Sequence, residues 1–137
     1  MATQTATAAT LRLQSASPSF TVNDLEKSRE FYCDVLGFQE GQRWERDGKL
    51  LGFELSAGDV VFMIGQDDFK KGRNRAKGEG FRIYCSTSRK VDEIAKEITA
   101  RGAMLDEGVK DEEWGRHISV TDPDGFKITI ANEKKTK

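Results

Sequence analysis

Hydrophobic and polar residues alternate along several short stretches of the chain, which is the pattern of β-strands with one buried face. In "SPSFTV", Pro18, Phe20 and Val22 fall on one face, and serines and a threonine fall on the other. The stretches "FQEGQRWER", "KLLGFEL" and "DVVFMIG" predict three further strands, separated by the turn sequences "RDGK" and "SAGD".

A helix is predicted between the first two of these strands, in "NDLEKSREFYCDVLGF". Asn23 or Asp24 can cap its N-terminus, and Gly37 supplies the signal for its end. The apolar spacing of about 3.6 residues predicts one inward stripe. That stripe consists of Leu25, Ser28, Phe31, Tyr32, Val35 and Leu36.

The same order begins again after the glycine-rich and charged stretch "QDDFKKGRNRAKGEG", which indicates a connecting loop. "FRIYCST" predicts a strand with Phe81, Ile83 and Cys85 on the core side. "SRKVDEIAKEITARG" predicts a helix that faces the core through Val91, Ile94 and Ile98 and ends at Gly102. Its expected cap is Ser86, Thr87 or Ser88. Three strands are expected in "AMLDEGV", "HISVT" and "FKITIAN".

The order of one strand, one helix and three strands therefore occurs twice. Such an internal repeat is stronger evidence for the fold than any single motif. We predict an α+β domain of two βαβββ modules, whose curved mixed sheets leave a concave cleft between them. The expected boundaries are a flexible tail at 1–14, one domain at 15–132 and a C-terminal tail at 133–137. Within the domain we expect modules at about 15–66 and 80–132, joined by a linker at 67–79.

Composition narrows the classes of function. The 137 residues are 36% hydrophobic and 33% charged, with a net charge of -1 and no basic stripe that would favour nucleic acid or an anionic membrane. No apolar run reaches the roughly 20 residues of a membrane span, and the N-terminal segment does not have the pattern of a secretory signal. We therefore expect a cytoplasmic protein in which Cys33 and Cys85 are reduced, structural thiols.

The repeat, with "FTVNDLEKSREFYCDVLGF" and "WGRHISVTDPDGFKITI", resembles the vicinal oxygen chelate superfamily over about 15–132. That superfamily includes glyoxalase I, extradiol dioxygenases and bleomycin-resistance proteins. The resemblance implies the glyoxalase/bleomycin-resistance fold, but this fold hosts both enzymes and pure binding proteins, so it does not define a chemistry.

The resemblance also implies where a divalent metal would be held in the members that do chemistry. Four inward-facing positions supply the ligands there, and they correspond here to Ser17, Met63, Gly80 and Thr129. None of the four is a competent ligand for a hard or borderline divalent ion. We therefore expect no metal, no cofactor and no catalytic residue of the family's metal-dependent kind.

His117 is the only histidine and is predicted to face the cleft with Ser119 and Thr121. It can act as a general base, hydrogen-bond a ligand or be a simple strand residue. Arg116 should point to the opposite face. "DPDG" is interpreted as the turn that closes the last hairpin, with Asp122 and Asp124 as turn formers.

Aromatic residues give the stronger indication of binding, because they offer rigid contact area to planar ligands. Trp44, Tyr84 and Trp114 are candidates, and Arg82 lies on the predicted face of Tyr84 and can pair with an anionic group. Packing or a dimer interface is the alternative role for both tryptophans. The predicted ligand-binding set is Ser17, Trp44, Met63, Arg82, Tyr84, Trp114, His117 and Thr129.

The leading hypothesis is a metal-free protein that sequesters an antibiotic or metabolite, working as a homodimer with two clefts. Bleomycin-resistance members also lack the metal ligands and carry a "WGR"-like strand and a "DP-G" turn. Those members are expected to be acidic, whereas this chain is nearly neutral. One alternative is a metal-dependent glyoxalase or dioxygenase with other ligands, such as His117 with Glu54. Another is a protein-interaction module with a closed cleft. The sequence leaves open whether the modules pair within one chain or across a dimer.

Overall fold

The structure is a computed structural model that describes residues 10–134. Residues 1–9 of the predicted N-terminal tail and 135–137 of the C-terminal tail lie outside the described residues. The elements follow the predicted order. They are β1 (Ser19–Val22), α1 (Leu25–Arg29), the π-helical η1 (Glu30–Leu36), β2 (Gln39–Arg46), β3 (Lys49–Ala57), β4 (Val60–Gln66), β5 (Arg82–Ser86), α2 (Val91–Ala100), β6 (Lys110–Glu112), β7 (Gly115–Thr121) and β8 (Lys127–Glu133).

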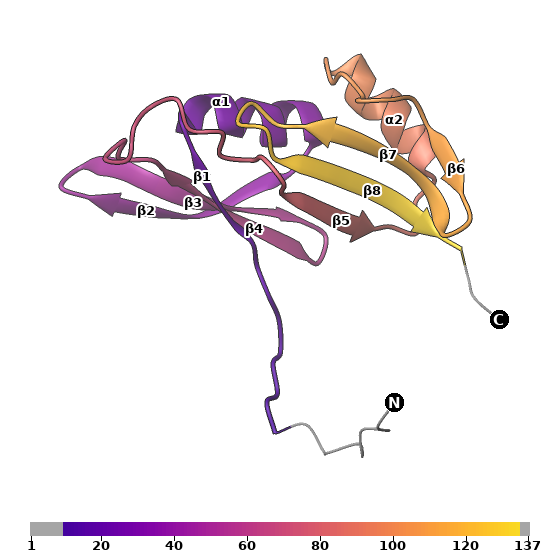
Figure 1. The fold of residues 1–137 in the computed structure, drawn as a ribbon, viewed down its shortest axis with the longest axis horizontal. Helices are drawn as coiled ribbons and strands as arrows, with labels where there is room; N and C mark the ends of the chain where they lie inside the picture. The colour runs from indigo at the N-terminus through magenta and orange to yellow at the C-terminus, as the bar shows by residue number, and fades with distance from the viewer. Residues whose placement is uncertain (1–9, 135–137) are drawn as a thin grey trace.

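The strands form two separate sheets of four, in the orders β1-β4-β3-β2 and β5-β8-β7-β6. In each sheet the first strand pairs in parallel with the last, and the remaining pairs are antiparallel. Figure 1 shows the sheets next to each other along the molecule, with both helices on one side. The α+β fold of two βαβββ units with mixed sheets is therefore confirmed, and the sheets do not close into a barrel.

One hydrophobic core connects the two units. Phe20 and Val22 of β1 are fully buried, as the alternation predicted. The ring of Phe20 stacks on Phe126 of the second unit with centroids 4.8 Å apart and also meets Phe81 edge-on at 5.3 Å. Burial of such aromatic surface is the main stabilising term in folding. The units are thus fastened to each other through the helix-facing sides of their sheets.

The first helix starts as predicted and then changes its winding. The Asp24 carboxylate accepts hydrogen bonds from the backbone N–H groups of Glu26 and Lys27, which is an N-cap. Gly37 ends the helix in the left-handed conformation, at φ 97°. Residues 30–36 form a π-helix, which the apolar spacing did not indicate. This wider winding accompanies full burial of Tyr32.

A polar contact inside the core ties η1 to the "DPDG" turn. The Tyr32 hydroxyl donates to Asp122 Oδ2 at 2.8 Å, while Asp122 Oδ1 accepts from the backbone N–H groups of Asp124 and Phe126. Asp122 is therefore the predicted turn former and also an anchor between the units. Burial raises the pKa of Asp122, and these three hydrogen bonds oppose that rise.

The cap of the second helix differs from the prediction. Lys90 is the N-cap residue, and no side chain of its own caps the helix, so the choice of Ser86, Thr87 or Ser88 was wrong. Instead, Asn132 Oδ1 on β8 accepts from the backbone N–H of Val91 at 3.0 Å, and Asn132 Nδ2 donates to the carbonyls of Thr87 and Arg89. The side-chain amide of Asn132, which is distant in sequence, therefore caps the helix in place of a nearby serine or threonine hydroxyl.

The sixth strand also differs in position. It covers Lys110–Glu112 rather than the "AMLDEGV" stretch. Leu105 and Val109 of that stretch pack against the core, but its backbone follows β7 through one hydrogen bond, from Asp106 N to Ser119 O. Packing without a ladder of hydrogen bonds does not make a strand.

The connecting loop contains a buried ion pair that the sequence did not indicate. Lys77 Nζ lies 2.9 Å from Asp67 Oδ2, and only 3% of the Lys77 side chain is exposed. Arg75 reaches the same oxygen at 3.1 Å. The Lys77 ammonium, with hydrogen bonds from Phe69 N–H and Arg75, lowers the pKa of Asp67 to about 2. The predicted connecting loop is therefore held in place at this point by a buried ion pair.

Candidate functional site

Three of the predicted ligand-binding residues form an aromatic group on the second sheet, on the face opposite its helix. The rings of Tyr84 and Trp114 meet edge to face at a centroid distance of 5.8 Å. Trp114 then stacks on the imidazole of His117 at 4.8 Å, with the planes 17° apart. Tyr84 is 62% exposed and Trp114 is 43% exposed. This Tyr84–Trp114–His117 group, the aromatic wall, is therefore open to a ligand.

The backbone explains why these side chains meet. Ile118 and Val120 are buried on the core side of β7, so His117 points to the other face, as predicted. Trp114 lies in the turn between β6 and β7, and Tyr84 alternates outward on the edge strand β5. Arg116 points away from the wall and pairs with Asp92 of α2 at 3.0 Å, as its parity required.

His117 has a carboxylate partner that the sequence analysis missed. Its Nε2 lies 2.5 Å from Glu112 Oε2 on β6, and only 13% of the His117 side chain is exposed. The buried Nδ1 has no hydrogen-bond partner among the described residues. A carboxylate next to an imidazole fixes its orientation and favours one tautomer. The short turn "EEWG" could have indicated this pairing from the sequence, because it places Glu112 and His117 on adjacent antiparallel strands.

Thr129 faces the same side as the wall but is occupied by a neighbour. Its hydroxyl lies 2.8 Å from the Ser119 hydroxyl, across the β7–β8 pair. Thr129 also stands opposite Tyr84 in the β5–β8 register and is buried. Thr129 is therefore a buried neighbour of the wall rather than a free polar group.

Trp44 and Met63 form a second group, on the first sheet. They line a shallow pocket of about 310 Å³ together with Ser19, Leu51, Gly52, Ile64 and Gly65. Trp44 stands opposite Gly52, and Gly52 stands opposite Gly65. A Cβ at Gly52 would lie 2.4 Å from the carbonyl oxygen of Ile64, so glycine is required for this close approach of the strands.

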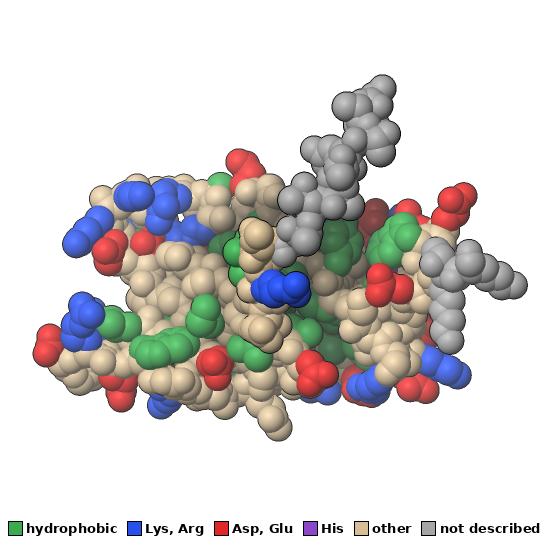
Figure 2. All heavy atoms as spheres, turned by 90° about the horizontal axis from the view of Figure 1, so that it is seen from below, with side chains coloured by type: hydrophobic (Ala, Val, Ile, Leu, Met, Phe, Trp, Pro, Cys, Tyr) green, Lys and Arg blue, Asp and Glu red, His purple; other side chains and the backbone are tan. Residues whose placement is uncertain are grey.

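The predicted residues thus fall into two groups rather than one cleft. The pocket beside the wall measures about 260 Å³, includes Tyr84 and Trp114, and shares no residue with the Trp44 pocket. Figure 2 shows the face away from the helices, where hydrophobic side chains lie in several patches. Ser17 lies ahead of β1 and Arg82 lies on β5, and both are exposed. Neither residue lines either of these two pockets.

The family's metal positions do not fit a divalent ion. Gly80 has no side chain, Met63 offers a thioether, and the Thr129 hydroxyl is paired with Ser119. Over residues 10–134, no group of three or more His, Cys, Asp or Glu side chains is arranged to hold a metal. Glu54 stands opposite Met63 on the first sheet, whereas His117 pairs with Glu112 on the second, so the structure does not bring Glu54 to His117.

The state of the cysteines and the length of the helices also bear on the predictions made from the sequence. Cys33 and Cys85 are both free, and burial raises the pKa of each thiol. No helix in the part of the chain that the structure describes is long and apolar enough to cross a membrane.

The amino-acid sequence matches the model of a known protein family. The sequence model of the Glyoxalase/Bleomycin resistance protein/Dioxygenase superfamily matches residues 13–130. A search of curated proteins found no match.

Solved structures of the same architecture are numerous. TioX from Micromonospora sp. ML1 aligns at 21% identity over 88% of this chain and 100% of its own, with a TM-score of 0.70. TnmS3, an antibiotic binding protein from Streptomyces sp. CB03234, aligns at 21% identity over 90% and 99%, with a TM-score of 0.69. A glyoxalase/bleomycin resistance protein from the same Streptomyces aligns at 24% identity over 87% and 100%, with a TM-score of 0.65. At these identities the likeness concerns the fold.

Proposed function

Because this chain belongs to the glyoxalase/bleomycin resistance protein/dioxygenase superfamily, we propose that it is a metal-free small-molecule-binding protein of the bleomycin-resistance type. Its task would be to sequester an antibiotic or a metabolite. The observation that carries the proposal is the aromatic wall, in which Tyr84 and Trp114 are exposed while His117 is held by Glu112.

The wall favours a planar aromatic ligand. Tyr84 stands edge-on to Trp114, so a flat ring system can stack against one ring while touching the edge of another. The ligand would contact the exposed rings of Tyr84 and Trp114 rather than His117, whose Nδ1 is buried beneath the wall. TnmS3, with the same fold, is described as an antibiotic binding protein, which supports this class of ligand.

Long-range electrostatics contribute little to the proposed binding. The net charge of the chain is -1, so a strongly cationic drug gains no substantial attraction from the protein as a whole. We therefore favour ligands that are bound mainly through apolar and aromatic contact.

The proposal includes a homodimer in which each cleft combines the first sheet of one copy with the second sheet of the other. In a single chain, Trp44 and Leu51 on the first sheet and Tyr84 and Trp114 on the second are exposed. Exposed aromatic residues on two faces are what an interface or a ligand would cover. A cytoplasmic location completes the proposal, and the free thiols Cys33 and Cys85 support it.

A thermal-shift screen tests ligand binding. Bleomycin-like glycopeptides, aromatic acids and thiol conjugates are added to chelator-treated protein, and a binder at about 100 times its Kd should raise Tm by several degrees. The shift should disappear in Trp114→Ala and persist in Met104→Ala, because Met104 is an exposed residue outside the pockets described. Equal shifts in both variants, or none with any ligand class, would count against the wall as the site.

Elemental analysis tests the metal-free part. Protein purified without chelator should contain no stoichiometric divalent ion, and one tightly held ion per chain would overturn this part of the proposal.

Mixed dimers test how the cleft is built. Trp44→Ala and Tyr84→Ala are each expected to weaken binding. If a cleft combines two copies, a dimer with one variant of each kind retains one intact cleft and binds half as much ligand as the wild type. If each cleft lies within one chain, the mixed dimer contains no intact cleft.

A second candidate function is supported by one contact. Glu112 lies 2.5 Å from His117 Nε2 and orients the imidazole as it would a general base; in an enzyme the accepting atom would be Nδ1, which binding of a ligand would have to uncover. His117→Gln separates the two functions. It should abolish turnover by an enzyme, whereas a sequestering protein has no turnover to lose and keeps most of its binding area.

A further inference from the structure

A cavity of about 390 Å³ lies between the two units, on the helix side of the sheets. The first unit contributes the end of η1, the start of β2 and the β3–β4 turn, and the second unit contributes β5, α2 and β8. Its volume falls in the range of roughly 300 to 1,000 Å³ that small-molecule sites occupy. It is larger than either pocket on the opposite face.

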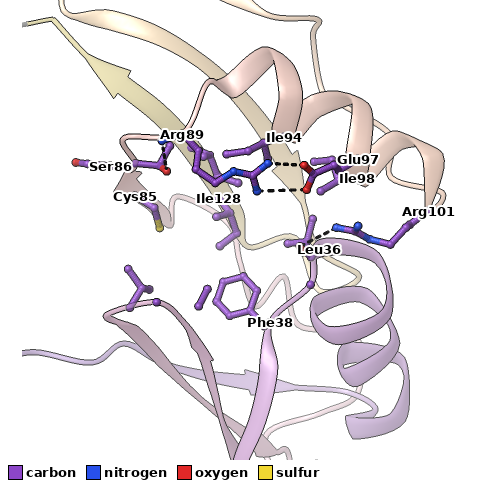
Figure 3. A pocket seen from close by; sticks show the side chains of 16 residues that line it. Leu36, Phe38, Cys85, Ser86, Arg89, Ile94, Glu97, Ile98, Arg101 and Ile128 are labelled. Atoms are coloured by element: carbon purple, nitrogen blue, oxygen red, sulfur yellow. Dashed lines mark hydrogen bonds and ion pairs between the residues drawn. The ribbon is translucent and has the colours of Figure 1, made fainter.

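The walls of this inter-unit cavity are mainly apolar. Figure 3 shows Phe38 facing Ile128 across the space, with Ile94 and Ile98 of α2 above them and the Cys85 thiol at one end. Cys85 points here because it alternates with Tyr84, which turns to the aromatic wall on the other side of β5. The apolar lining residues are Leu36, Phe38, Ala57, Val60, Cys85, Ile94, Ile98, Ile128 and Ile130.

The charged groups lie at the rim and carry an excess of positive charge. Arg89 is paired with both carboxylate oxygens of Glu97. Arg101 donates from Nε to the Val35 carbonyl at 2.7 Å and from one terminal nitrogen to the Leu36 carbonyl at 3.2 Å. The ion pairs formed among residues 10–134 do not include Arg101, so its charge has no carboxylate partner there.

A mainly apolar cavity, with one guanidinium at its rim that forms no direct ion pair among the described residues, fits a particular kind of molecule. The apolar part of a ligand gains from leaving water, at about 25 cal/mol per Å² of buried surface. A carboxylate can complete the Arg101 pairing, because guanidinium groups bind carboxylates well and are held in place here by two carbonyls. A cation would meet the net positive rim, and a neutral apolar molecule would leave Arg101 without a partner.

We propose that the inter-unit cavity is a second ligand site, which binds a small amphipathic monocarboxylate with its apolar body against Phe38 and Ile128 and its carboxylate at Arg101. The cavity and the pocket beside the aromatic wall lie on opposite sides of β5, where Cys85 and Ser86 line both. The proposal does not depend on the function proposed for the wall. Because both units line the cavity, a bound carboxylate also bridges them and stabilises their packing.

Calorimetric titration of the full chain with octanoate, and with octanol as its neutral counterpart, tests the charge preference. Octanoate should bind at least about tenfold more tightly, which corresponds to one charge-assisted hydrogen bond. Arg101→Gln should remove this difference, and Arg101→Lys should restore part of it. Octanol binding as tightly as octanoate, or an unchanged preference in Arg101→Gln, would overturn the assignment.

Alkylation of Cys85 gives a second readout of position. Because Cys85 also lines the pocket beside the wall, protection by octanoate should persist in Trp114→Ala, and its loss there would place the ligand at the wall. In the Cys33→Ser background, saturating octanoate should slow the reaction of Cys85 with iodoacetamide by about tenfold, because the ligand covers the thiol. Ile94→Trp, which fills the cavity, should abolish both binding and protection, and Met104→Ala should change neither. A urea midpoint for each variant confirms folding. Octanoate binding without protection of Cys85, or binding that survives Ile94→Trp, would place the ligand elsewhere.

Discussion

The hydroxyl of Tyr32 donates a 2.8 Å hydrogen bond to Asp122, and this contact spans the boundary between the two βαβββ units inside the core. Both residues are buried, so neither can exchange its partner for water without opening the interface. The contact joins a π-helical segment of the first unit to the turn that closes the second.

Tyr32→Phe should therefore destabilise the protein. The variant keeps the ring in the aromatic cluster but removes one of three hydrogen bonds to a buried carboxylate, which should cost about 1–3 kcal/mol. Urea unfolding monitored by tryptophan fluorescence measures the change. Tyr84→Phe is the control, because the Tyr84 side chain is exposed and should change stability by less than about 0.5 kcal/mol. Equal effects of the two substitutions would contradict the anchoring role.

The Asp67 ion pair predicts a specific loss of stability in acid. Lys77 leads the interactions that lower the pKa of Asp67 from 3.8 to about 2. A carboxylate whose pKa is lowered on folding stabilises the folded state above its unfolded pKa, and this contribution is lost as the pH falls through its folded pKa. Asp67→Asn should thus be less stable than the wild type at pH 7, and the gap should narrow between about pH 4 and 2.

Urea midpoints of both proteins across this range provide the measurement. Asp68→Asn is the matched control, because Asp68 is an exposed neighbour with an exposed lysine partner and should show almost no gap at any pH. A gap for Asp67→Asn that stayed constant down to pH 2 would show that the ion pair is not its cause.

Gly52→Ala should test the close approach of β3 to β4. The added methyl would meet the Ile64 carbonyl at 2.4 Å, and backbone atoms can move away only by distorting the sheet. We expect a loss of about 1–3 kcal/mol, measured by thermal or urea unfolding. Gly65→Ala on the facing strand is the control, since nothing lies within 4 Å of a Cβ there. A harmless Gly52→Ala would mean that the strands separate easily.

Asn132→Ala should weaken the start of α2. It removes the acceptor for the Val91 N–H and the donor to two loop carbonyls, a loss of about 1–2 kcal/mol. Ser88→Ala should have little effect, although Ser88 was one of the caps that the sequence suggested. If Ser88→Ala were the more damaging change, the local cap would be the correct one.

The contrast between Ser88, a local cap suggested by the sequence, and Asn132, the distant residue that caps α2, shows which parts of the fold could be predicted. Features governed by near neighbours were predicted. The alternation placed Phe20 and Val22 inward, Asp24 capped the first helix, and the left-handed pair Asp47 and Gly48, at φ 53° and 74°, forms the predicted tight turn.

Features that depend on chain segments far apart were not predicted. Asn132 reaches α2 from β8, Tyr32 reaches Asp122 across 90 positions, and Lys77 is buried only because the loop folds back onto Asp67. Side-chain pairing of this kind follows from packing and leaves no periodic mark on the sequence.

The candidate site shows the same division. Strand parity placed His117 and Tyr84 on the face opposite the helix, and the family resemblance placed Thr129 there, as the structure has them. Three other features could not be predicted, because they depend on how whole strands lie relative to each other. These are the contacts among the aromatic rings, the pairing of His117 with Glu112, and the separation of the Trp44 group from the wall.

The pairing of β1 with β4, rather than with its neighbour in sequence, also affects the order in which the protein folds on the ribosome. The backbone of β1 has no strand partner until Gln66 has been synthesised. The stacking partner of Phe20, Phe126, emerges later still. The nascent chain therefore carries an unpaired apolar strand until about half of it has been synthesised, a state that favours chaperone binding and makes slow translation before β4 a risk for aggregation.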